Sequence, residues 1–253
     1  MKNILKIIPW GTILRIIGLL CVALLLLSMA WVAYFSVFDV TKTPQMAFYK
    51  FDAKGDSLNF KVEHQWVPID SISRNMIVAI LAAQDKDFYI HDGFSLISGE
   101  DSIISRIPNH HETISQRTAH TVFLTKDDSW VKNILEPYFT TLEEYLWGKD
   151  RILEIYLNTV LTGDGIFGVE AASQIYFGKG AGNLTLNEAA FIASTLENPV
   201  YIDINNPSEE ILTKQKEILL RMGFIMHIKL GKTPIDEKEP RPLKTINKRN
   251  WKG

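Results

Sequence analysis

Residues 83–94 concentrate the side chains of this sequence that are best suited to chemistry. They end a strongly apolar stretch and bring together acids, aromatic rings and an imidazole, including Asp85, Phe88 and His91. Gln84 stands where a carboxylate could take a proton. A carboxamide does not titrate near neutral pH and offers only hydrogen bonds. The sequence therefore describes either an enzyme or a protein that has lost its catalytic base.

The clearest structural element of the sequence is an uncharged apolar run at residues 16–35. Roughly 20 such residues are what a helix needs to cross a bilayer. Lys2, Lys6 and Arg15 precede the run and no positive excess follows it, which predicts a cytoplasmic N-terminus and an extracytoplasmic remainder. The alternative is a cleaved signal peptide, because residues 28–30 resemble a cleavage site. The apolar run continues past that site, which favours an anchor.

Composition divides the chain into five parts. They are a cytoplasmic N-terminus (1–15), a transmembrane helix (16–35), a linker (36–46), one domain (47–228) and a flexible basic tail (229–253). Within the domain, residues 47–67 alternate apolar and polar side chains, which predicts a short β-hairpin. Helical patterns follow, so the expected fold class is mostly α.

Start signals accompany the predicted helices. Asp70 or Ser71 is expected to cap the first, Pro137 lies inside the second, and Thr185 with Glu188 forms a capping box for the fifth. The helices are expected at residues 71–88, 129–147, 151–161, 169–176, 186–196 and 207–227.

The run KDRILEIYLN at residues 149–158, followed by glycines at fixed spacing and by residues 176–179, resembles a known family. It is similar to the monofunctional biosynthetic peptidoglycan glycosyltransferases of family 51, which polymerise lipid II. The resemblance covers roughly residues 60–226. It implies a lysozyme-like α fold, a donor glycan strand on a lipid pyrophosphate, and lipid II as acceptor. Within the run, Lys149 and Arg151 are interpreted as fold or helix-start residues rather than catalysts.

The reaction that this resemblance implies needs a base and positive charge. The acceptor hydroxyl loses a proton while it attacks the anomeric carbon with inversion. The pyrophosphate leaving group needs Lys or Arg side chains, or a divalent ion, to meet its growing charge. The resemblance requires no cofactor, but it allows a divalent cation, Mg²⁺ or Mn²⁺, bound with the pyrophosphate.

The family's first motif, Glu-Asp-x-x-Phe-x-x-His-x-Gly, places its base on Gln84. Its second motif, Gly-x-Ser-Thr-Ile-Ser-Gln-Gln-x-x-Lys-Asn, keeps Thr113 to Gln116 but has Glu112 for the serine, Arg117 for the second glutamine and His120 for the lysine. The third motif's Arg-Lys pair becomes Lys132-Asn133, and its glutamate is Glu136. The resemblance thus implies catalytic positions at Gln84 and Glu136, no metal ligand, and substrate-binding residues Asp85, Phe88, His91, Thr113, Gln116, Arg117, His120 and Lys132.

These replacements fall on the base and on the cations, so catalysis is expected to be lost or strongly weakened. A general base alone contributes about 10²–10⁴-fold. The alternative is an active lipid II polymerase that uses Glu136 with a relocated base, Glu112 or His120. A metal site formed by Glu112 and His120 with His110 and His111 is a further, weaker alternative.

The expected partners are lipid II, the glycan strand, the membrane and other cell-wall synthesis proteins. A net charge of −2 argues against a nucleic-acid partner. The expected location is the bacterial cytoplasmic membrane, with one span and an extracytoplasmic domain. Apolar residues make up 46% of the chain, enough for a packed core, and the single cysteine excludes an internal disulfide.

Overall fold

The computed structural model describes residues 10–52, 62–94, 112–124, 130–199, 204 and 206–225, without the side chains of 50–52, 130 and 131. The α-helices are α1 Trp10–Phe35, α2 Pro44–Asp52, α3 Arg74–Gln84, α4 Ile114–Phe123, α5 Trp130–Leu146, α6 Lys149–Thr159, α7 Val169–Phe177, α8 Leu186–Thr195 and α9 Glu209–Ile225. The short elements are η2 Ile69–Ser71, η3 Ala181–Asn183, β1 Glu63–His64, β2 Leu161–Gly163 and β3 Ile166–Phe167. Helices dominate, which confirms the mostly-α class.

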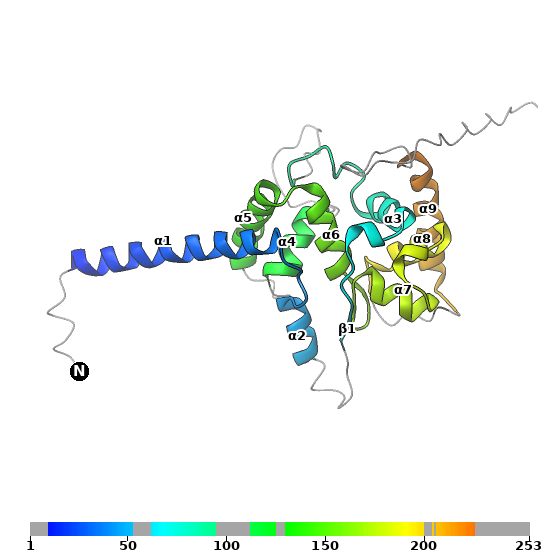
Figure 1. Ribbon diagram of the computed structural model, residues 1–253, viewed down its shortest axis with the longest axis horizontal. Coiled ribbons are helices and arrows are strands. Elements are labelled where there is room, and N and C mark those ends of the chain that lie inside the picture. Colours follow the sequence, from blue (N-terminus) through cyan, green and yellow to red (C-terminus); the bar gives the residue numbers. More distant parts are fainter. Residues whose placement is uncertain are drawn as a thin grey trace, which may run out of the picture.

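The domain consists of two groups of helices that share one core (Figure 1). α3 packs against α8 and α9, while α4 packs against α5 and α6. The sequence of α3 explains its central place, because an uninterrupted apolar stretch from Met76 to Ala82 is buried throughout. Its C-terminal residue, Gln84, is therefore carried by one of the best-packed helices of the domain.

The predicted hairpin at residues 47–67 is wrong in its first part, because residues 44–52 form helix α2. Thr43 Oγ1 accepts the Met46 N–H at 3.1 Å, which starts this helix, and Tyr49 bonds to Asp164 in a remote turn. Residues 53–61 lie outside the described ones. The observed sheet has the order β1-β3-β2, with β1 parallel to β3. Its hairpin joins β2 and β3 instead.

Helix starts were partly misplaced. Ser73, not Asp70 or Ser71, caps α3 by accepting the Met76 N–H at 3.2 Å, and α3 ends at Gln84 rather than Phe88. The capping box of Thr185 with Glu188 is confirmed. Pro137 lies inside α5 as predicted. The predicted tail at 229–253 lies outside the described residues.

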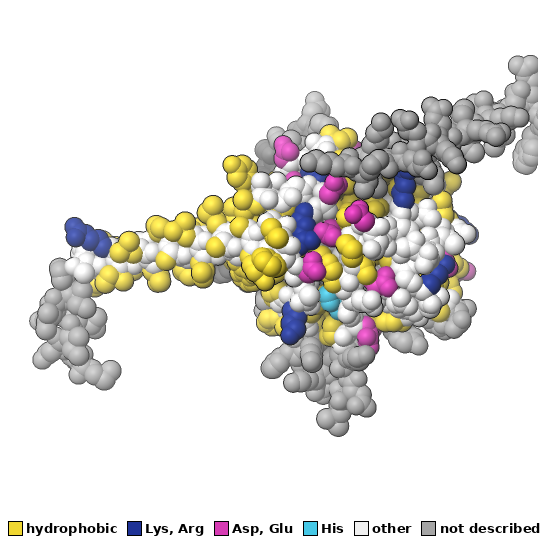
Figure 2. All heavy atoms as spheres, in the orientation of Figure 1, with side chains coloured by type: hydrophobic (Ala, Val, Ile, Leu, Met, Phe, Trp, Pro, Cys, Tyr) yellow, Lys and Arg dark blue, Asp and Glu magenta, His cyan; other side chains and the backbone are white. Residues whose placement is uncertain are grey.

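α1 is long and apolar enough to cross a membrane, and it projects from the domain with hydrophobic side chains on its surface (Figures 1 and 2). Its C-terminal end is fixed to the domain. Trp147 Nε1 donates to the Val32 carbonyl at 2.8 Å, and the Arg151 guanidinium donates to the carbonyls of Phe35 and Phe38. The domain is thus held directly against the end of the apolar helix.

Candidate functional site

The end of α3 places Gln84 on the wall of a cleft of about 620 Å³. Side chains from the ends of α3 and α8 and from along α9 line this cleft, and they are both charged and apolar. They include Gln84, Asp85, Lys86, Ser194, Glu197, Lys214, Arg221 and Phe224. None of Gln116, Arg117, His120, Lys132 and Glu136 is among the lining residues. The predicted site residues therefore fall into two groups, and Asp85 lines the cleft while it also bonds to the first residue of α4.

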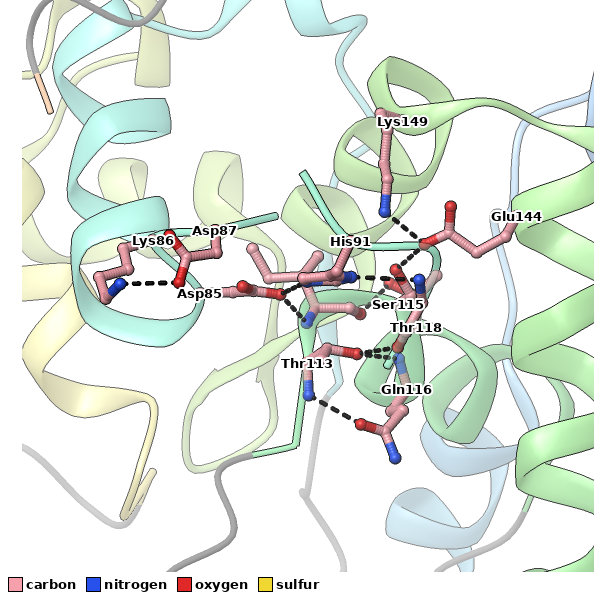
Figure 3. Close-up of polar contacts among 12 residues, drawn as sticks. Asp85, Lys86, Asp87, His91, Thr113, Ser115, Gln116, Thr118, Glu144 and Lys149 are labelled. Carbon is pink, nitrogen blue, oxygen red and sulfur yellow. Dashed lines mark hydrogen bonds and ion pairs between the residues drawn. The ribbon is translucent and has the colours of Figure 1, made fainter. Parts of the chain in front are cut away.

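Asp85 ties the segment after α3 to the start of α4 (Figure 3). One of its carboxylate oxygens accepts from His91 Nε2 at 2.8 Å and from the Ile114 N–H at 3.1 Å. The Gly93 N–H donates to His91 Nδ1, so the proton of the neutral ring lies on Nε2. Both side chains are nearly buried, His91 at 11% and Asp85 at 7% exposure. The Asp85–His91 pair therefore holds the loop after α3 against the start of α4.

A capping box forms the start of α4. Gln116 donates its N–H to Thr113 Oγ1, and its side-chain oxygen accepts the Thr113 N–H, both at 3.1 Å. The Thr113 hydroxyl also donates to the Gly93 carbonyl at 2.6 Å. Both residues were expected to bind substrate, and the structure shows that they also join the first two motifs.

A half-buried ion pair that the sequence did not predict lies behind this loop. Glu144 Oε1 accepts from Lys149 Nζ at 2.6 Å and from Ser115 Oγ at 2.5 Å. Lys149 Nζ lies 4.6 Å from the ring centroid of Phe88, which is fully buried. Figure 3 shows Ser115, Glu144 and Lys149 on the same side of the loop as His91. Lys149 and Phe88 thus support this loop from within, and Lys149 also begins α6.

Glu136 is half-buried on α5 and meets residues of the second motif. Burial raises its pKa above the usual value, and the charge of Glu112 raises it further. The charge of Lys132 and a hydrogen bond with Gln116 lower the pKa of Glu136. The second and third motifs therefore meet at these residues. A carboxylate with a raised pKa is better suited to accept a proton near neutral pH.

Arg117 and Tyr156 meet between α4 and α6. Burial raises the pKa of the Tyr156 hydroxyl, while the neighbouring Arg117 guanidinium lowers it. Glu112 and Asp85 add weaker effects that raise it. His120 lies half-buried in the last turn of α4. Arg117 is thus the cation that acts on Tyr156, where the charges of Glu112 and Asp85 also act.

A metal site finds little support among these residues. In the described parts of the chain, no group of three or more His, Cys, Asp and Glu side chains could hold a metal ion. The Asp85 carboxylate is already engaged by two hydrogen bonds. His110 and His111 lie outside the described residues. A divalent ion bound with the pyrophosphate stays a prediction.

Glu143 should make stability depend on pH. It is fully buried on α5, neither carboxylate oxygen has a hydrogen-bond partner, and burial raises its pKa well above the ordinary 4.5. The folded state therefore holds this proton more tightly than the unfolded state. Its contribution to stability is complete below pH 4.5 and is lost as the pH rises through the folded-state pKa.

Glu143→Gln cannot lose that proton, so its melting temperature should rise relative to the native protein as the pH increases from 4.5 to 9. Glu209→Gln, at an exposed position, is the control and should give a constant difference. Thermal unfolding across this range measures both. A Glu143→Gln difference that does not change with pH would show that Glu143 is ionised in the folded protein.

Comparison with known proteins supports one family. The family model described as Transglycosylase matches residues 54–223. The chain is 37% identical over 197 residues to a biosynthetic peptidoglycan transglycosylase of Bacteroides thetaiotaomicron, covering 76% of this chain and 79% of that protein. It is 41% identical over 204 residues to the Shewanella amazonensis protein of the same name, covering 79% and 82%. The Bdellovibrio bacteriovorus protein of that name is 34% identical over 218 residues, covering 85% and 87%.

Proposed function

The chain belongs to the peptidoglycan transglycosylase family, and on that premise we propose that it binds lipid II and glycan strands while its polymerising reaction is lost or strongly weakened. It would act in cell-wall assembly as a binding or scaffold protein. The resemblance inferred from the sequence is confirmed at the level of the family, and the loss of catalysis is the new claim.

The observation that carries the proposal is Gln84 beside a loop whose other contacts are intact. The residue ends a packed helix and faces a cleft. Next to it, the Asp85–His91 pair and the Thr113–Gln116 capping box are intact. The surroundings are therefore built to hold the side chain in place, yet a carboxamide there cannot take the acceptor's proton.

The replaced cations support the same conclusion. His120 stands where the family has a lysine, and Asn133, exposed on α5, stands where it has a second one. Histidine carries a full charge at neutral pH only when its pKa is raised, and asparagine carries none. The developing charge on a pyrophosphate leaving group would meet fewer fixed cations.

We place the domain outside the cytoplasmic membrane, with the N-terminus inside. α1 supplies the span, and the basic residues before it supply the orientation. The hydrogen bonds from Trp147 and Arg151 to the end of α1 hold the domain close to the bilayer, where a lipid-anchored ligand would be found.

One observation favours the second candidate, an active polymerase. Glu136 is half-buried, and its pKa is raised by burial and by Glu112. Two neighbouring carboxylates that share a site can divide the roles of acid and base. In that case Glu112 would replace the missing base, and any polymer formed would depend on both residues.

Binding of a fluorescent lipid II analogue to the full-length protein in detergent tests the proposal. We expect saturable binding that Gln84→Ala weakens by less than about tenfold, because the amide contributes at most one or two neutral hydrogen bonds. Lys216→Ala, at an exposed position on α9, is the control and should bind normally. A native protein that does not bind the analogue would overturn the proposal.

A further inference from the structure

One wall of the cleft beside Gln84 consists of α9 side chains that none of the family motifs described above includes. Glu217, Arg221 and Phe224 line the cleft from this helix. The cleft volume of about 620 Å³ lies within the range of about 300–1,000 Å³ that is typical of ligand sites. The cleft therefore has room for a ligand that extends beyond the side chain of Gln84.

The charges of the cleft balance one another. Its lining holds three acids and three bases, namely Asp85, Glu197, Glu217, Lys86, Lys214 and Arg221. Lys214 Nζ lies 2.8 Å from a Glu197 oxygen, and Arg221 Nη2 lies 3.5 Å from a Glu217 oxygen. Paired charges in equal number favour no ion of either sign, but they offer hydrogen-bond donors and acceptors side by side. The cleft therefore suits a neutral ligand that is rich in hydroxyl groups.

Phe224 adds an apolar surface next to these charges. Its side chain is 85% exposed, and the paired side chains of Arg221 and Glu217 are each 57% exposed. The three residues are spaced by three and four positions, so they share one face of α9. The negative face of an aromatic ring attracts the C–H groups on the apolar side of a sugar ring. The hydroxyl groups at the edge of the same sugar can bond to the paired charges. The α9 wall thus combines the two surfaces that a saccharide requires.

The cleft lies at the end of the domain that is far from α1. In Figure 1, α1 projects from one side of the domain, whereas α8 and α9 lie on the opposite side. With α1 in the bilayer, a lipid chain stays on the α1 side of the domain. The cleft therefore meets the part of a lipid-linked ligand that extends away from the membrane. In the proposed ligand, that part is the sugar chain.

We infer that Glu217, Arg221 and Phe224 bind sugar units of the glycan strand beyond the unit that contacts Gln84. Phe224 stacks on the face of one sugar ring, while Arg221 and Glu217 bond to its hydroxyl groups. Gln84 lines the same cleft from α3, so a strand of several sugars makes contacts that a single disaccharide does not. This inference rests on the proposed function and assigns the saccharide contact within it.

The test measures binding of a lipid-free and peptide-free tetrasaccharide of N-acetylglucosamine and N-acetylmuramic acid to the full-length protein in detergent. Phe224→Ala should raise its Kd roughly three- to tenfold, as expected for the loss of one aromatic contact. Phe224→Tyr keeps the ring and should bind like the native protein. Leu220→Ala is the matched control, because Leu220 is 72% exposed on the same helix but is not among the lining residues. Its Kd should stay within about twofold of the native value.

A second ligand separates this inference from the proposed function. Arg221→Gln should weaken the tetrasaccharide by a factor similar to that of Phe224→Ala. Its affinity for the fluorescent lipid II analogue, which carries a single disaccharide, should stay within about twofold. Tetrasaccharide binding that Phe224→Ala and Arg221→Gln leave unchanged would overturn the inference, and so would a native protein that binds only the lipid II analogue. Both results leave the proposed function standing. Failure of the native protein to bind the analogue would overturn the proposed function itself.

Discussion

Restoring three family residues together, Gln84→Glu, His120→Lys and Asn133→Lys, should raise lipid II polymerisation by at least about 100-fold, because a general base contributes 10²–10⁴-fold. Gln84→Glu alone should give less than about tenfold, since catalytic groups that act as a unit are strongly non-additive. A base without cations to receive the leaving pyrophosphate completes only half of the site. Gel analysis of polymer from labelled lipid II measures both variants.

The matched control is the double variant His120→Lys, Asn133→Lys, which restores the cations and leaves Gln84. It should remain near the native rate, because nothing then takes the acceptor's proton. Full activity from Gln84→Glu alone would show that the base is the only defect. Full activity from the double variant would show that another residue, with Glu112 the first candidate, already serves as base.

Asn158→Ala should lower the free energy of unfolding by about 3–5 kcal/mol, because it removes several buried hydrogen bonds at once. Asn158 is fully buried at the end of α6. Its side-chain oxygen accepts the Val67 N–H at 2.9 Å, and its side-chain nitrogen donates to the carbonyls of Val67 and Glu154 at 2.8 Å. These bonds hold the strand-like segment that leads into α3, and thereby Gln84.

Chemical denaturation of the full-length protein in detergent measures this loss. Asn187→Ala, at an exposed position on α8, is the matched control and should change stability by less than about 0.5 kcal/mol. A loss below about 1 kcal/mol for Asn158→Ala would mean that water or a shifted backbone replaces the missing bonds. α3 would then be anchored mainly by its packing against α8 and α9.

Local sequence signals predicted the elements that depend on local contacts. The capping box of Thr185 and Glu188 involves residues three positions apart, so it is visible in the sequence and is present in the structure. α5 forms around Pro137 as predicted, since its other residues favour a helix. The helix at 44–52 was missed because the aromatic alternation around Tyr49 imitates a strand. Its contact with Asp164 lies far away in the sequence.

In the candidate site, too, local features could be predicted from the sequence and long-range contacts could not. Its residue types could be assigned from motif spacing, and the structure brings Gln116, Lys132 and Glu136 together. The burial of Glu143 and the pairing of half-buried Glu144 with Lys149 could not be predicted, because an acidic residue on a helix usually faces solvent. The requirement for glycine at position 168 could also be recognised only in the structure. A Cβ there would lie 2.5 Å from the Asn158 carbonyl oxygen, and its φ is +83°.

The central claim is that this protein keeps the fold and the ligand site of its family but not the reaction. The rate of lipid II polymerisation by the native full-length protein, measured beside an active relative, tests it most directly. We expect a rate at least about 100-fold below that of the relative, consistent with the loss of a general base. A comparable rate that Glu136→Gln abolishes would contradict the claim and would establish an active polymerase with a relocated base.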